Sequence, residues 1–138
     1  MNSRIIIGWT EEIFIDFARE VIADVYGPQE PSEIFVSERS EELLLAAESG
    51  EFDLAILMIN NIMLPGLGSW TERWPQLLEF LSTLHSRYQI PIVALAGSVP
   101  VEVENLNEIG VEFFYHAPVS LDVLRKAIQH CSLCTRCV

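Results

Sequence analysis

Basic residues are scarce in this sequence, and long apolar runs are absent. The 138-residue chain carries 20 acidic side chains against 8 basic ones, and its net charge of −12 repels nucleic-acid phosphates and anionic membrane surfaces. The longest strongly apolar run, residues 54–59 (LAILMI), is much too short to cross a bilayer, and residues 1–8 lack a signal-peptide core. We therefore expect a cytoplasmic protein that binds neither nucleic acid nor membrane.

Low-complexity tracts, linker-like stretches and convincing internal repeats are also missing. A chain of this length can bury one sizeable core, so we expect a single domain over residues 1–130, followed by a short tail over residues 131–138.

Cysteine is absent from the first 130 residues and then occurs three times, as Cys131, Cys134 and Cys137. Two interpretations stay open: three thiols on a fraying helix end, or a zinc or iron–sulfur half-site, because thiolates at this spacing can converge on one ion or cluster. The half-site is one ligand short, and the adjacent His130 is poorly placed to complete it. We expect the tail to lie outside the folded core, and any metal there to add little to the stability of residues 4–130.

What the sequence does contain is a regular alternation of strand-like and helix-like segments. Apolar runs predict strands at residues 4–8, 33–36, 54–59, 91–95 and 111–115. Amphipathic segments predict helices at residues 13–25, 40–49, 70–88, within 101–109, and 121–130, with Ser40 and Ser69 as N-caps. This pattern indicates an α/β fold with one doubly wound parallel sheet, helices on both faces, and any site at the carboxyl ends of the strands.

Three segments make the chain resemble the receiver domains of two-component response regulators: FDLAIL followed by LPG, PIVALAG, and GVEFFYHAPVSLDVLRKAI. None is a sharp motif alone, but their order and spacing cover residues 4–130. The resemblance implies a flavodoxin-like strand order, 2-1-3-4-5. It also implies an acidic pair after the first strand that holds magnesium, a phospho-accepting Asp, a Ser or Thr ending the fourth strand, and a Lys before the last proline.

Each of those functional positions carries a different residue type here. Alignment puts Trp9 and Thr10 at the acidic pair, Met58 at the acceptor, Ala96 at the hydroxyl and Ala117 at the lysine. A small shift of the alignment does not help, because the sole lysine is Lys126 and the four aspartates lie in helices or at the start of a strand. We therefore expect no bound magnesium. Glu11 and Glu12 are an alternative acidic pair, but we interpret them as first-turn helix residues, because no second carboxylate converges with them.

The simplest interpretation of these substitutions is apolar filling of the strand ends, with Trp9 largely buried against Met58 and Ala96. Two alternatives are that the filling locks the domain in one state or that it forms a small apolar ligand pocket. Asn60 or Asn61 can instead occupy the end of the third strand, because the connection to Pro65 is about three residues longer than in the family. Two amides before a glycine-rich turn leave anion binding as a further alternative.

We predict a binding module and not an enzyme, because no nucleophile, base and oxyanion constellation emerges. The resemblance implies that a protein partner or a second copy binds the surface of the fourth helix, fifth strand and fifth helix. That surface would comprise Glu102, Glu104, Glu108, Glu112, Phe114, Arg125 and Lys126. The alternative is a redox or metal sensor that uses the cysteine tail, and one of Trp70 and Trp74 is an alternative partner anchor.

Overall fold

The structure, a computed structural model, describes residues 3–27, 33–66 and 68–136, with side chains in the last helix described only as far as Cys131. Strands and helices alternate along the chain. Their bounds are β1 (Arg4–Gly8), α1 (Glu12–Tyr26), β2 (Glu33–Val36), α2 (Ser40–Ser49), β3 (Leu54–Met58), α3 (Trp70–Ser82), β4 (Ile92–Ala96), α4 (Val103–Glu108), β5 (Phe113–His116) and α5 (Leu121–Arg136).

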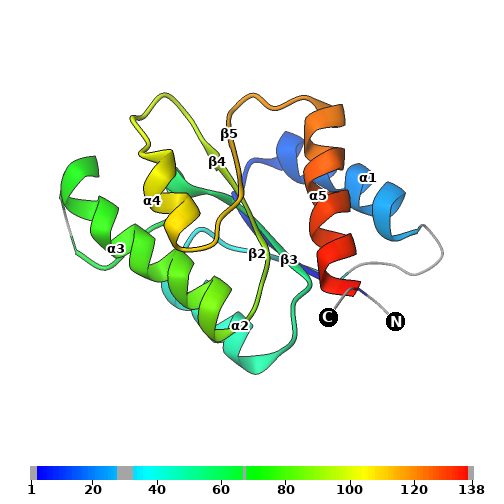
Figure 1. Ribbon diagram of the computed structural model, residues 1–138, viewed down its shortest axis with the longest axis horizontal. Helices are drawn as coiled ribbons and strands as arrows, with labels where there is room; N and C mark the ends of the chain where they lie inside the picture. Colours follow the sequence, from blue (N-terminus) through cyan, green and yellow to red (C-terminus); the bar gives the residue numbers. More distant parts are fainter. Residues whose placement is uncertain (1–2, 28–32, 67, 137–138) are drawn as a thin grey trace.

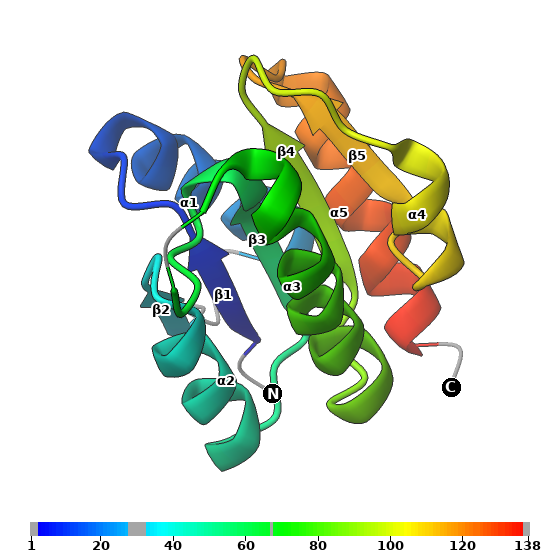
Figure 2. The same cartoon turned by 90° about the vertical axis from the view of Figure 1, so that its left-hand side faces the viewer.

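The five strands form one parallel sheet in the order β2-β1-β3-β4-β5, which confirms the predicted topology. Helices α1 and α5 cover one face of the sheet, and α2, α3 and α4 cover the other (Figures 1 and 2). The strands β3 and β4 are buried along their whole length, as expected for the centre of a sheet covered on both faces.

Two apolar clusters fill the space between the layers. The cluster beneath α1 and α5 includes Ile7, Met58 and Leu95, and the cluster beneath α2, α3 and α4 includes Leu57, Ala96 and Leu106. Neighbouring residues such as Leu57 and Met58 fall in different clusters because successive strand side chains point to opposite faces.

Local sequence signals explain where the first and third helices begin and end. The Ser69 hydroxyl accepts a hydrogen bond from the Glu72 amide at 3.3 Å, which confirms the predicted cap of α3. The Glu11 carboxylate caps α1 by accepting a hydrogen bond from the Ile13 amide, and α1 is followed directly by Gly27, whose φ of 100° favours glycine. Beyond α3 the helix widens into a π-helical turn, Thr83–Arg87.

Two helix boundaries differ from the prediction. Ser40 is the first residue of α2 and is buried, while Arg39 precedes the helix without a side-chain cap. The last helix does not end near His130 but continues to Arg136, and Cys131 is 4 % exposed within the cluster under α1 and α5. The expectation that the core excludes everything from Cys131 onward is therefore wrong at Cys131. Among the described residues, no helix has the length and apolarity needed to span a membrane.

Candidate functional site at the carboxyl edge of the sheet

The carboxyl ends of all five strands lie along one edge, because the strands are parallel and in close register. Gly8 of β1 pairs with Leu57 of β3, Met58 of β3 with Leu95 of β4, and Ala96 of β4 with His116 of β5. The residues that the resemblance assigns to the site lie at the ends of these strands or in the loops that follow them.

Met58 and Ala96 close the ends of the two central strands. Met58 is 3 % exposed and Ala96 is 0 % exposed, but Met58 packs beneath α1 and α5 while Ala96 packs on the opposite face. A thioether and a methyl group can neither bind a divalent cation through oxygen nor accept a phosphoryl group. Ala117 is half-buried and joins the cluster of Met58.

Trp9 lies in the loop after β1, where it is partly buried. Its ring packs on Phe14 of α1, with ring centroids 4.7 Å apart, in the cluster that contains Met58. Ala96 belongs to the cluster on the other face of the sheet, so the predicted contact of Trp9 with both Met58 and Ala96 is wrong. Alternation along the strands accounts for this split, because Met58 and Ala96 have opposite orientations.

A chain of polar contacts crosses the edge above these apolar residues. It begins at Thr10, whose amide donates to the Glu38 carboxylate at 3.2 Å, and the Asn61 side-chain amide donates to the same carboxylate oxygen at 3.4 Å. The Asn60 Nδ2 donates to the Asn61 side-chain Oδ1 at 3.2 Å, and the Asn60 Oδ1 accepts from the Gly97 backbone amide at 2.8 Å. One polar network therefore connects the loops after β1, β2, β3 and β4.

His116 extends this network to the end of β5. Its Nδ1 lies 3.1 Å from the Gly97 carbonyl oxygen, and its ring meets Phe114 edge-on with centroids 5.0 Å apart. The Ala117 amide donates to the Ala96 carbonyl at 2.7 Å. The residue before Pro118 is thus held by backbone bonding to β4, while the exposed His116 side chain bonds the start of the next loop.

Asn60 therefore occupies the position facing β4, one of the two possibilities that the long connection to Pro65 left open. Its side-chain oxygen accepts a hydrogen bond from the Gly97 amide, the first N–H beyond β4. The side chain of the neighbouring Asn61 donates to a carboxylate. That carboxylate, Glu38, disfavours an anion at the same place, so the geometry gives the anion-binding alternative no support. Sequence reasoning named Asn60 but missed Glu38 and Gly97, because neither shows a local pattern that predicts a long-range contact.

The described residues hold no group of three or more His, Cys, Asp or Glu side chains that would suit a metal ion. Glu12 is exposed in the first turn of α1, as interpreted from the sequence, whereas Glu11 lies one position earlier as the N-cap. The side chains of Cys134 and Cys137 lie outside those that the structure describes, so the tail hypothesis stays a hypothesis there.

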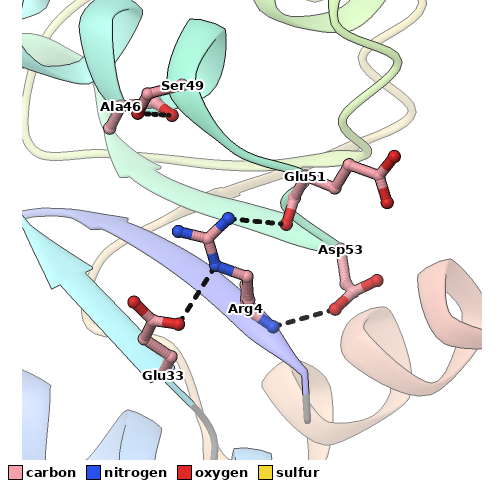
Figure 3. A network of polar contacts seen from close by, with 6 residues as sticks. All are labelled: Arg4, Glu33, Ala46, Ser49, Glu51 and Asp53. Atoms are coloured by element: carbon pink, nitrogen blue, oxygen red, sulfur yellow. Dashed lines mark hydrogen bonds and ion pairs between the residues drawn. The ribbon is translucent and has the colours of Figure 1, made fainter. Parts of the chain in front are cut away.

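Asp53 lies at the opposite edge, as predicted. Its carboxylate accepts from the Arg4 amide at 2.8 Å, and the Arg4 guanidinium bonds Glu33 at 3.1 Å and the Glu51 carbonyl at 3.5 Å (Figure 3). The same guanidinium lies 4.5 Å from the ring centroid of Phe52. This network joins the starts of β1, β2 and β3, so Asp53 has a structural role far from the carboxyl edge.

The residues of the predicted partner surface do not all face the same way. The glutamates of α4 and its flanking residues are all exposed: Glu102, Glu104, Glu108 and Glu112. Lys126 is exposed on α5 and Phe114 is half-buried under α3 and α4. Arg125 differs, because its guanidinium pairs with Asp24 of α1 at 2.9 Å and therefore faces α1.

Two tryptophans of α3 attach the loop after β4 to the rest of the fold. Trp70 Nε1 donates to the Pro100 carbonyl at 2.7 Å, and Trp74 Nε1 donates to Asn105 Oδ1 at 3.0 Å. Their rings lie 5.5 Å apart. Both indoles are half-buried and bond α4 or the segment before it.

Comparison with solved structures gives high-probability matches over nearly the whole chain. The signal receiver domain of a modulated diguanylate cyclase from Desulfovibrio desulfuricans G20 matches with a TM-score of 0.69 and 17 % identity, covering 99 % of this chain and 98 % of that one. The chemotaxis response regulator CheY4 of Vibrio cholerae matches with a TM-score of 0.65 and 15 % identity, covering 95 % and 99 %.

A third match is the receiver domain of a sensor histidine kinase from Pseudomonas aeruginosa, solved with a magnesium ion in its active-site cleft. Its TM-score is 0.64 at 13 % identity, with coverage of 96 % and 98 %. No protein-family model matches the sequence, and no curated protein is significantly similar to it. The chain therefore has the fold of response-regulator receiver domains, and that fold is what these distant likenesses show.

Proposed function

We propose that this chain is a receiver-like signalling module that works by protein contact and without phosphorylation. The observation that carries the proposal is the closed carboxyl edge of the sheet. Met58 and Ala96 end the central strands as buried apolar residues, and the Asn60 side-chain oxygen accepts a hydrogen bond from the Gly97 N–H in the loop that follows Ala96. We infer that these side chains leave no metal ligand and no phosphoryl acceptor at the ends of the central strands.

Chemistry supports the same proposal. Phosphoryl transfer depends on positioning and on neutralising charge with metal ions and cations. At this edge the network offers one carboxylate, Glu38, that is already bonded to Thr10 and Asn61. The sole lysine, Lys126, projects from α5 as an exposed side chain and supplies no cation to the network.

The proposed contact surface is the side of the molecule formed by α4, β5 and α5, and the proposed partner is another protein or a second copy of this chain in the cytoplasm. Exposed carboxylates make this side acidic, with Lys126 as a single exposed lysine on α5. The indole bonds of Trp70 and Trp74 hold α4 in place without any signal from the carboxyl edge. A surface held in this way is available for binding at all times.

Site-specific photo-crosslinking in the cell that encodes the chain tests this proposal. A photoreactive residue replaces Glu108 on α4, and the matched control replaces Glu48, an exposed glutamate of α2. We expect a discrete crosslinked product from position 108 and none from position 48, with a yield that acetyl phosphate and magnesium do not change in lysate. Equal products from both positions, or a product that requires the phosphodonor, would refute the proposal.

A further inference from the structure

A cavity of about 290 Å³ opens between the start of α1 and the connection from β5 to α5. Figure 1 shows these two segments side by side, at the same edge of the sheet as the polar network. The rings of Trp9, Phe14 and Phe17 form one wall, and residues 117–119 form the other. The cavity is separate from that network, since Glu38, Asn60 and Gly97 do not line it.

Apolar residues around the cavity remain partly exposed to water in the folded chain. Ile13 stands at the rim with 79 % of its surface exposed, and Trp9 and Phe17 are half-buried. Covering such surface is favourable by about 25 cal/mol for each Å² removed from water. An apolar concavity of this kind with few polar groups is typical of a small-molecule site, and its volume lies just below the usual range of about 300–1,000 Å³.

Charge restricts the occupant. Among the described residues that line the cavity, Glu11 is the only charged one, and its Oε1 is fixed at the rim by the Ile13 amide at 3.3 Å. The exposed Glu12 and Asp16 follow on α1, and the whole chain carries a net charge of −12. Aromatic faces attract cations through their quadrupoles, so the aromatic rings and the Glu11 carboxylate both favour a positively charged ligand.

From this geometry we propose that the cavity binds a small organic cation that carries one apolar ring, of the arylalkylammonium class. The ring packs against Trp9 and Phe17, and the ammonium group meets the Glu11 carboxylate at the rim. Ala117 contributes a small side chain that leaves the space open. This inference does not depend on the proposed partner surface, which lies on α4, β5 and α5.

Titration monitored by ¹H–¹⁵N spectra, with three probes of nearly equal shape, tests the inference. Phenethylammonium should give saturable shifts at the Trp9 indole and at Ile13, Phe17 and Val119. The neutral 2-phenylethanol should bind about tenfold more weakly, as expected for loss of one charge-assisted contact, and 3-phenylpropanoate should give no saturable shift. Equal affinity for cation and anion, no saturation with the cation, or shifts centred on the Trp70 and Trp74 indoles would overturn the proposal.

Matched variants locate the effect. Glu11→Gln keeps the carbonyl that caps α1 and should reduce affinity for the cation to that for the alcohol, whereas the adjacent Glu12→Gln should change it less than twofold. Ala117→Leu should fill the cavity and abolish shifts for every probe, with its melting curve showing that the domain remains folded. Retained binding in a folded Ala117→Leu protein, or equal effects of the two glutamine variants, would contradict the assignment. The partner crosslink from position 108 is scored separately, so either proposal can fail alone.

Discussion

At the scale of single residues, the carboxyl edge is built mainly from apolar side chains at the strand ends, with a polar network beside them. The sequence predicts that Met58, Ala96 and Ala117 stand where charged or hydroxyl groups would be required, and the structure places all three at the ends of their strands or just beyond. The sequence alone does not reveal that Asn60 bonds the Gly97 amide, because the two residues lie 37 positions apart. Local patterns carry no information on such pairs.

Asn60→Ala tests whether this bond stabilises the fold. The substitution leaves the Gly97 amide without its 2.8 Å acceptor, so we expect the free energy of unfolding to fall by about 1 kcal/mol. Urea denaturation measures it. The control is Asn107→Ala, an exposed asparagine of α4, which should change stability by less than about 0.5 kcal/mol. Similar small losses for both variants would contradict a structural role for Asn60.

Trp9→Ala tests the half-buried position of the indole. A fully buried tryptophan would cost 3–5 kcal/mol on truncation, and because Trp9 packs on Phe14 with part of its ring in water we expect a loss of about 2 kcal/mol. The control, Ile13→Ala at the exposed rim of the same cavity, should cost less than about 0.5 kcal/mol. A cost near 5 kcal/mol would show that Trp9 is a core residue after all.

At the scale of elements, the predicted strands and helices are confirmed in order and type, and the errors fall at their ends. The strands were predictable because buried parallel strands are continuous apolar runs. The end of α5 was not, because the cysteines suggested a separate tail, whereas Cys131 continues the apolar face of the helix into the core. The indole bonds from α3 to α4 were also hidden, since a tryptophan pair four residues apart indicates burial but not its polar partner.

Trp74→Phe tests whether the indole holds α4 in place. Phenylalanine keeps an aromatic ring but removes the donor to Asn105 Oδ1, so amide hydrogen exchange in α4 should become about fivefold to tenfold faster, as expected from losing one hydrogen bond of about 1 kcal/mol. Exchange in α5 should be unchanged. The matched control Trp9→Phe, on the other face of the sheet, should leave α4 protection as it is. Unchanged α4 exchange in Trp74→Phe would show that α4 is held by other contacts.

Cys131→Ser tests whether the domain ends before or after this residue. Placing a hydroxyl in an apolar cluster should lower the free energy of unfolding by about 1–3 kcal/mol, because the site is 4 % exposed. Cys131→Ala, which adds no polar group, should cost less. Thermal or urea unfolding in the presence and absence of a chelator measures both effects. If stability falls only when the chelator is present, a metal at the tail, and not the packing of Cys131, supplies the stability.

At the scale of the whole molecule, the chain has the fold of receiver domains, while the residue types at its carboxyl edge differ from those that the resemblance implies for phosphorylation. Fold depends on apolar patterning and on the right-handed crossovers of parallel strands, and both are spread over the whole chain. Phosphorylation depends on a few side chains, so those can change while the sheet stays the same. This explains why the topology was predictable from the sequence, although the matched solved structures share less than a fifth of their residues with it.

The most direct test of the central claim is incubation of the intact chain with acetyl phosphate and magnesium, followed by intact-mass measurement and ¹H–¹⁵N spectra with beryllofluoride. A receiver domain that retains its acceptor aspartate serves as the positive control. The closed carboxyl edge predicts no added mass of about 80 Da, the mass of a phosphoryl group, and no magnesium-dependent shifts at Met58, Asn60 or Gly97. A stable adduct, or shifts at those residues that require magnesium, would contradict the account and show that this edge still works as a phosphorylation site.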